Sequence, residues 1–163
     1  MKNPLLYQRS EYDCGPTAML NAISYLFDRE EIPPELIRNI MLYCLDCYGA
    51  DGISGKSGTS CTAMMFLSNW LNGFGKVGRL PVSSQYLTGR DVYIESQSSV
   101  CDGLRRGGAV VVRLFFDEWH YVLLTGLSGD RVLLGDLDRD GRDAVVPGRV
   151  PDSLRHGHIA LGR

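Results

Sequence analysis

Hydrophobic and polar positions follow two different patterns along this chain. In the first part, apolar residues recur every three or four positions, the spacing that places them on one face of a helix. This spacing predicts three helices, over residues 16–27, 34–47 and 61–71. Between the second and third, residues 49–60 hold four glycines among small polar residues and are expected to form a loop.

The second and third helices are each expected to turn one apolar face inward. In the second helix this face comprises Leu36, Ile37, Ile40, Met41 and Cys44. In the third helix it comprises Ala63, Met64, Leu67, Trp70 and Leu71. Ser60 has a residue type that caps helix N-termini, and Asn72-Gly73 are expected to end the third helix.

After residue 74 the pattern changes to that of strands. Weak signals predict short strands over 77–80 and 92–95, followed by a helical turn or two over 100–106. The stronger segments are rich in valine and leucine and are separated by turn residues. They are 109–116, 121–127 and 131–134, with shorter ones at 144–146 and 158–161.

The three strong strands should form an antiparallel meander, because only short turns connect them. Helices first and strands second predict an α+β fold of two packed layers. We therefore expect one domain over residues 1–163, with N-terminal helices packed on a C-terminal antiparallel sheet.

Composition limits the classes of partner. The chain is 44% hydrophobic and 22% charged, with a formal net charge of -2, so it has no basic surplus for nucleic acid. Its first residues lack the apolar core of a signal peptide, and the apolar run at 109–116 is too short to span a membrane. We expect a cytoplasmic protein that is not embedded in a membrane, with its five cysteines reduced.

Cys14 is the first candidate for chemistry. Proline fits the start of a helix, so Gly15-Pro16 place Cys14 at or just outside a helix N-terminus. The unpaired N–H groups and the positive end of the helix dipole favour a thiolate there. The alternative is a cysteine that is only a small buried residue, but a helix start followed by Gly-Pro usually lies at a surface or cleft.

A thiol nucleophile needs a base, and His120 is the candidate. It opens the strand predicted at 121–127, and loops and strand ends commonly supply functional residues. A cysteine at a helix start and a distant histidine in the other layer are typical of a nucleophile and base that meet only in space. The alternative is a half-buried histidine held by a backbone carbonyl.

The imidazole in turn needs a group that orients it, and Asp136 follows the next strand. Counting back across the turn at 128–130 places position 136 opposite 121–122, beside His120. Asp138 and Asp140 compete for this role.

The same aspartates resemble the start of a calcium-binding loop. The twelfth position of such a loop requires glutamate, and counting from Asp136 this position is Pro147, which argues against calcium.

Acyl transfer also requires donors aimed at the oxyanion. Gln8 lies six residues before Cys14, and its side-chain amide could act together with the Cys14 backbone N–H.

The segments QRSEYDCGPTAMLNA, WHYVLLTG and GDLDRDG together resemble the papain-like cysteine peptidases that remove double-glycine leader peptides from bacteriocin precursors, and their stand-alone relatives. The resemblance implies a papain-like fold. It also implies Cys14 as the nucleophile and His120 as the base. By the same resemblance Asp136 orients the base and Gln8 is the oxyanion donor. Residues 28–107 lie outside the resemblance, so leader-peptide specificity does not follow from it.

Two further motifs suggest metals. Cys44 and Cys47 form a Cys-x-x-Cys pair, which elsewhere binds zinc or does redox work, but only Cys61 and Cys101 are left as partners. His156 and His158 could be metal ligands, but an alternating pair on an edge strand more often faces solvent. We expect no metal and no cofactor.

The sequence therefore predicts a cysteine peptidase that acts on a peptide or protein substrate through a thioester on Cys14. Two alternatives remain open. The acyl group could pass to an amine or thiol in place of water, or the chain could be an inactive peptidase-like module that binds peptides. The pattern predicts no particular oligomeric state, and residues 49–60 could act as a lid.

Overall fold

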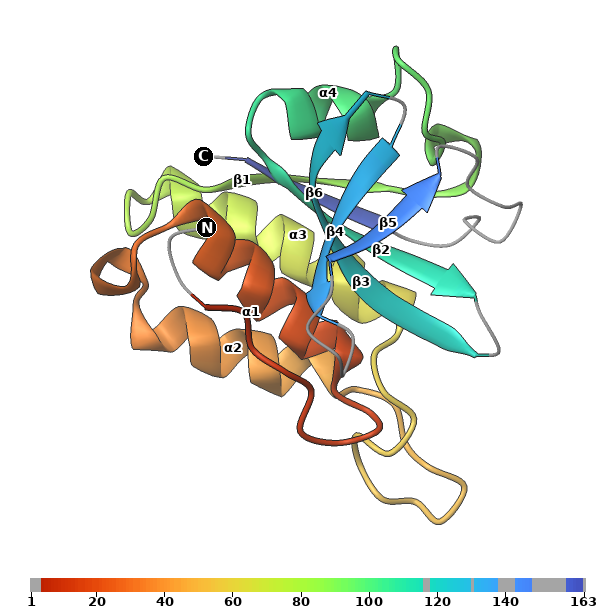
Figure 1. The fold of residues 1–163 in the computed structure, drawn as a ribbon. Helices are drawn as coiled ribbons and strands as arrows, with labels where there is room; N and C mark the ends of the chain where they lie inside the picture. The colour runs from red at the N-terminus through yellow and green to blue at the C-terminus, as the bar shows by residue number, and fades with distance from the viewer. Residues whose placement is uncertain (1–3, 116–117, 130, 138–142, 148–157, 163) are drawn as a thin grey trace.

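The computed structural model describes residues 4–115, 118–129, 131–137, 143–147 and 158–162; for residues 131, 135–137, 143–147 and 158–162 it describes the backbone alone. Helices from the first half of the chain pack on one face of an antiparallel sheet built mainly from the second half (Figure 1). The predicted α+β architecture is confirmed. In the described part of the chain, no helix has the length and apolar character needed to cross a membrane.

The helices and strands occur in separate parts of the chain. The helices are α1 (Cys14–Leu26), α2 (Pro34–Cys44), α3 (Cys61–Lys76) and α4 (Ser99–Arg105), with short 3-10 helices η1 (Arg29–Glu31) and η2 (Gly89–Asp91). The strands are β1 (Ser83–Leu87), β2 (Ala109–Phe115), β3 (Trp119–Ser128), β4 (Arg131–Leu137), β5 (Asp143–Pro147) and β6 (His158–Gly162).

Helix α1 begins at Cys14, two residues before the proline that was expected to open it. The first four N–H groups of a helix have no partner within it, so Pro16 removes no hydrogen bond at the third position. Much of the helix is buried, and it packs on β2 and β3. Cys14 is therefore the first helical residue.

Helix α2 ends at Cys44, earlier than the predicted Cys47. The residues that follow bond to a distant loop instead of continuing the helix. The Asp46 carboxylate accepts the Ser60 N–H at 2.8 Å, and the Cys47 carbonyl accepts the Gly55 N–H at 2.8 Å. These tertiary contacts compete with further helical turns.

The buried face of α2 is narrower than predicted. Leu36, Ile40 and Cys44 are fully buried, whereas Ile37 and Met41 are exposed. The three buried residues are four positions apart, so they form a single line along the helix.

Helix α3 has the predicted cap but a later end. The Ser60 hydroxyl accepts the Ala63 N–H at 3.0 Å, as an N-cap does. The helix continues through Asn72 to Lys76, because the Asn72 side chain bonds the backbone N–H and carbonyl of Ser84 at 2.8 Å each. Four of the five predicted inward residues are buried, and Trp70 is partly buried at the edge of the core.

The prediction of strands at 77–80 and 92–95 is wrong, because these residues form turns and irregular segments in the structure. Leu80 is nevertheless buried, which shows that a short apolar run can fill the core from a turn. The strand actually present in this region is β1, whose sequence SSQYL carries little strand signal.

The strand order is β1-β6-β2-β3-β4-β5 in the described sheet. The predicted meander of β2, β3 and β4 is confirmed. Strand β6 pairs antiparallel with both β1 and β2, so the last strand of the chain lies inside the sheet.

The sheet has an apolar core on each face. Helices α1, α2 and α3 cover one face, where Met19, Ile23 and Leu123 are buried. Helix α4 covers the other face, where Leu104 and Val122 are buried. The described fold therefore has a small third layer that the two-layer prediction omitted.

Candidate active site

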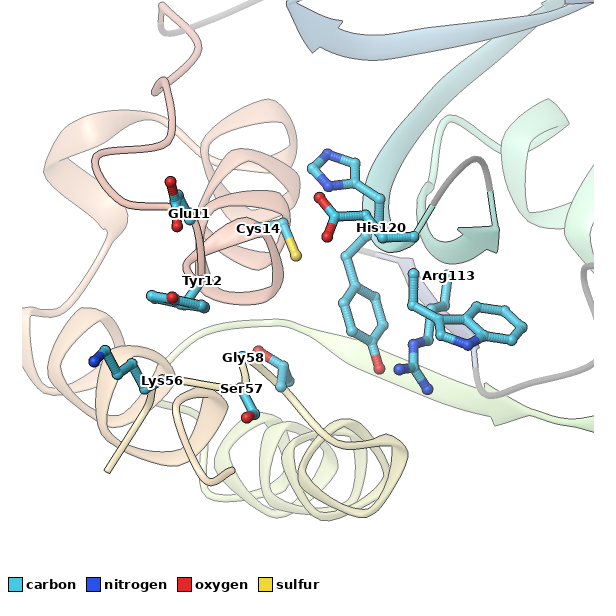
Figure 2. Close-up of a pocket in the computed structure, with 12 residues that line it drawn as sticks. Glu11, Tyr12, Cys14, Lys56, Ser57, Gly58, Arg113 and His120 are labelled. Atoms are coloured by element: carbon cyan, nitrogen blue, oxygen red, sulfur yellow. The ribbon is translucent and has the colours of Figure 1, made fainter. Parts of the chain in front are cut away.

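A cavity of about 630 Å³ lies where the start of α1 faces the start of β3 (Figure 2). We call it the Cys14 cavity. The described residues that line it come from the segment around the start of α1, the loop before α3, strands β2 and β3, and the position just before β3. They are Glu11, Tyr12, Cys14, Lys56, Ser57, Gly58, Thr59, Arg113, Glu118, Trp119, His120 and Tyr121.

Cys14 is half-buried at the first position of α1. The residue before it, Asp13, makes no side-chain cap to the helix. Its buried carboxylate instead accepts the N–H groups of Arg9 and Ser10, at 2.9 and 3.0 Å. Asp13 therefore folds the preceding segment back and leaves the amide donors of the first helical turn free of its own side chain.

His120 is the second residue of β3, where it pairs with Leu114 of β2. Its side chain is half-buried. Figure 2 shows the imidazole projecting from β3 toward the start of α1, where Cys14 lies on the facing wall of the cavity. The structure thus brings together the two residues that the sequence predicted as nucleophile and base.

Asp136 belongs to β4, and its side chain lies outside the described residues. Strands β3 and β4 are antiparallel, with Leu124 paired to Leu134. The β4 backbone therefore runs from Leu134 toward the beginning of β3, which carries His120. The competing residues Asp138 and Asp140 also lie outside the described residues.

Gln8 is exposed and does not line the Cys14 cavity. The backbone on both sides of it is tied to α1. Leu6 exchanges two hydrogen bonds with the Asn21 side chain, at 2.7 and 3.0 Å, and Arg9 donates to Asp13. The backbone of Gln8 is therefore held near the helix while its side chain faces solvent.

The loop before α3 packs directly against the start of α1. A Cβ atom built on Gly15 would lie 2.1 Å from the Thr59 hydroxyl oxygen, so only glycine fits there. Thr59 is buried, and its hydroxyl has no hydrogen-bond partner among the described residues. Sequence reasoning missed Thr59, since nothing in a glycine-rich loop marks which residue meets the helix.

Arg113 is a second residue of the cavity that the site prediction missed. Its guanidinium carbon lies 4.7 Å from the ring centroid of Trp119 and 5.7 Å from that of Tyr121. It also donates to the Cys61 sulfur at 3.2 Å. The available signal was a charged residue inside the valine-rich segment 109–116, which marks a point where one strand face leaves the core.

The other thiols have different surroundings. Burial raises the pKa of the Cys44 thiol, and burial followed by the charge of Asp46 raises the pKa of Cys47. Of the Cys-x-x-Cys pair, Cys44 is buried in the core and Cys47 lies in the loop after α2. Among the described residues, no group of three or more histidine, cysteine and acidic side chains gathers as a metal site would require. His156 lies outside the described residues, as does the side chain of His158.

Among the solved structures that share this fold are the following two. One is a double glycine motif protease from an AMS/PCAT transporter, solved in complex with the leader peptide. It is 14% identical, with a TM-score of 0.54, and the match covers 97% of this chain and 89% of that chain. The other is a putative C39-like peptidase from Bacillus anthracis. It is 15% identical, with a TM-score of 0.59, and the match covers 98% of this chain and 94% of that chain.

No protein-family model matches the sequence, and no curated protein does. The structural matches nevertheless extend over nearly the whole chain. The chain therefore has the fold of double-glycine and C39-like peptidases, as the sequence resemblance predicted.

Proposed function

We propose that this protein is a cysteine peptidase with Cys14 as the nucleophile and His120 as the general base. One observation carries the proposal. The thiol at the start of α1 and the imidazole at the start of β3 line the same cavity, in a chain with the fold of C39-like peptidases.

The reaction follows from this arrangement. His120 takes the proton of the Cys14 thiol, and the thiolate attacks the carbonyl carbon of a peptide bond. His120 then gives the proton to the leaving amine as the C–N bond breaks, and a thioester remains on Cys14. Water, deprotonated by His120, attacks the thioester, and the carboxylic acid leaves as the thiol is restored.

Two further groups complete the proposal. Negative charge develops on the carbonyl oxygen, and the Cys14 backbone N–H at the helix start is a donor for it. We assign the second donor to the Gln8 amide, whose backbone is held near α1. We assign the orientation of the His120 ring to Asp136, because the β4 backbone runs toward the start of β3.

The proposed substrate is a peptide or protein, which enters a cavity open to solvent. All five cysteines are free in the structure. Free thiols support a reducing compartment, and we place the enzyme in the cytoplasm.

A cleavage experiment tests this function. The protein is incubated with peptides from a digested proteome, and new peptide ends are identified by mass spectrometry. We expect new ends with the parent and none with Cys14→Ser or His120→Ala. Cys47→Ser is the matched control, since it makes the same change in a loop thiol and should leave cleavage intact.

Cleavage that persists in Cys14→Ser would contradict the proposal. Peptides that bind the parent and are released uncut would instead identify a peptide-binding module. Products that carry an added amine in place of water would identify an acyltransferase on the same thiol.

A further inference from the structure

The Cys14 cavity contains a cation that the proposed reaction does not use. Arg113 is half-buried on β2, directly opposite Tyr121 of β3 in the strand register. Its side chain lines the same cavity as Cys14 and His120. A guanidinium in the wall of a peptide-binding cavity is placed to contact whatever occupies that cavity (Figure 2).

Aromatic rings hold this guanidinium in place. Its central carbon is 4.7 Å from the Trp119 ring centroid and 5.7 Å from that of Tyr121. Rings interact with the faces of a guanidinium, while its five N–H donors lie in its plane. Contact with both rings therefore stabilises the guanidinium at this place in the wall. One of its N–H groups donates to the Cys61 sulfur at 3.2 Å.

The other charged side chains that line the cavity are more exposed than Arg113. Lys56 forms an ion pair with Asp51 of its own loop at 2.5 Å. Glu11 and Glu118 are exposed side chains. Arg113 is thus a cation in the more enclosed part of the wall, with acidic groups toward solvent.

We propose that Arg113 is a specificity residue that binds a carboxylate of the substrate. The carboxylate is either an acidic side chain or the carboxyl terminus of a short peptide. A fixed, planar fork binds a carboxylate through two parallel charge-assisted hydrogen bonds, which a neutral amide cannot match. Glu11 and Glu118 disfavour further acidic residues, so the site selects one carboxylate in an otherwise neutral or basic segment.

This inference rests on the proposed function in one respect, since it takes the bound molecule to be the peptide that Cys14 attacks. Its test uses binding alone, so that it does not depend on cleavage. The Cys14→Ala protein is immobilised and offered two libraries of short random peptides. One library has free carboxyl termini, and the other has amidated termini.

The expected result is a preference for a carboxylate of about 10-fold or more, the range of a hydrogen bond to a charged group. Enrichment of Asp or Glu in both libraries identifies an acidic side chain. Preference for the free-acid library without such enrichment identifies the carboxyl terminus. Either preference should disappear in Cys14→Ala/Arg113→Met and should weaken in Cys14→Ala/Arg113→Lys, which keeps the charge without the fork.

Arg79 supplies a matched control. It is a surface arginine that also lies over an aromatic ring, that of Phe74, and it does not line the cavity. Cys14→Ala/Arg79→Met should keep the carboxylate preference. If Arg113 only supports the wall, its variants would weaken the binding of peptides with and without a carboxylate equally, and the inference would be wrong.

Equal binding of the two libraries by the Cys14→Ala protein, without enrichment of Asp or Glu in either library, would also overturn it. If Cys14→Ala/Arg113→Met does not fold, the carboxylate preference of Cys14→Ala/Arg113→Lys tests the inference. Failure of the proposed function is seen separately, as an absence of cleavage by the parent protein with carboxylate-selective binding retained.

Discussion

The oxygen of a carbonyl attacked by Cys14 gains negative charge, and Gln8 is the side chain that we propose to stabilise it. Gln8→Ala should lower kcat by about 10²–10³-fold, the usual effect of losing one oxyanion donor. KM should change little, because the donor acts on charge that exists only in the transition state. Steady-state kinetics on a cleaved peptide measure both constants.

The control for Gln8 is Gln97→Ala, another exposed glutamine, whose amide bonds Glu95. It should leave kcat unchanged. Because Gln8 faces solvent in the structure, equal rates for Gln8→Ala and the parent would make it a surface residue with no catalytic role.

The residue that orients His120 can be identified by isosteric substitutions. Asp136→Asn should lower kcat by roughly 10³–10⁴-fold with the fold retained, since an amide cannot stabilise the imidazolium and can hold the wrong tautomer. Asp138→Asn should have a mild effect. Kinetics together with circular dichroism distinguish lost turnover from lost structure.

The opposite result, with Asp138→Asn inactive and Asp136→Asn active, would mean that the orienting residue lies two positions further along the chain than the predicted register suggests. It would remove Asp136 from the site.

At the scale of elements, the position of the first turn of α1 depends on its contact with the loop before α3. Gly15→Ala would place a methyl group where the Thr59 side chain lies. We expect a loss of stability of about 1–3 kcal/mol from overpacking, and a larger relative loss of kcat because Cys14 adjoins the displaced residue. Thermal unfolding and kinetics on the same preparation measure the two effects.

Removing the Thr59 side chain tests whether its clash with the new methyl group causes these losses. Thr59→Gly should restore part of the activity of Gly15→Ala, since it deletes the atoms that the new methyl group meets. Gly73→Ala in α3 is the control, because nothing lies within 4 Å of its Cβ position, and it should not reduce activity. A Gly15→Ala protein with normal activity would show that this contact does not position Cys14.

Element prediction from the sequence succeeded where one segment carries its own pattern. The apolar periodicity of α1 and the valine-rich sequence of β2 follow from local physics. The end of α2 could not be predicted, because Asp46 bonds Ser60 across a loop. Strand β1 was missed for a similar reason: its polar sequence is a strand because it pairs with β6 and bonds Asn72.

At the scale of the whole molecule, the site forms where the N-terminal helices meet the C-terminal sheet. Cys14 and His120 could be predicted separately, since each lies at the start of an element and has a residue type suited to the chemistry. The positions of Arg113 and Thr59 in the same cavity depend on how the layers pack. Thr59 leaves no local pattern in the sequence, and the charge of Arg113 within an apolar segment does not indicate which cavity it lines.

Pairing of Cys14 with His120 across this junction is the central claim, and alkylation tests it most directly. The protein is treated with iodoacetamide at pH 6, where ordinary thiols react slowly, and each cysteine is quantified by peptide mapping over time. Cys44 and Cys47 should react slowly, because their pKa values are raised. Cys61, which accepts a hydrogen bond from Arg113, is the chief competitor.

We predict that Cys14 is modified first in the parent protein, because the imidazole that we propose as its base would take its proton. In His120→Ala this rate should fall toward that of an ordinary thiol, while the rates of the other cysteines stay unchanged. Earlier modification of Cys61 or Cys47, or a Cys14 rate that is the same with and without His120, would contradict the proposed catalytic pair.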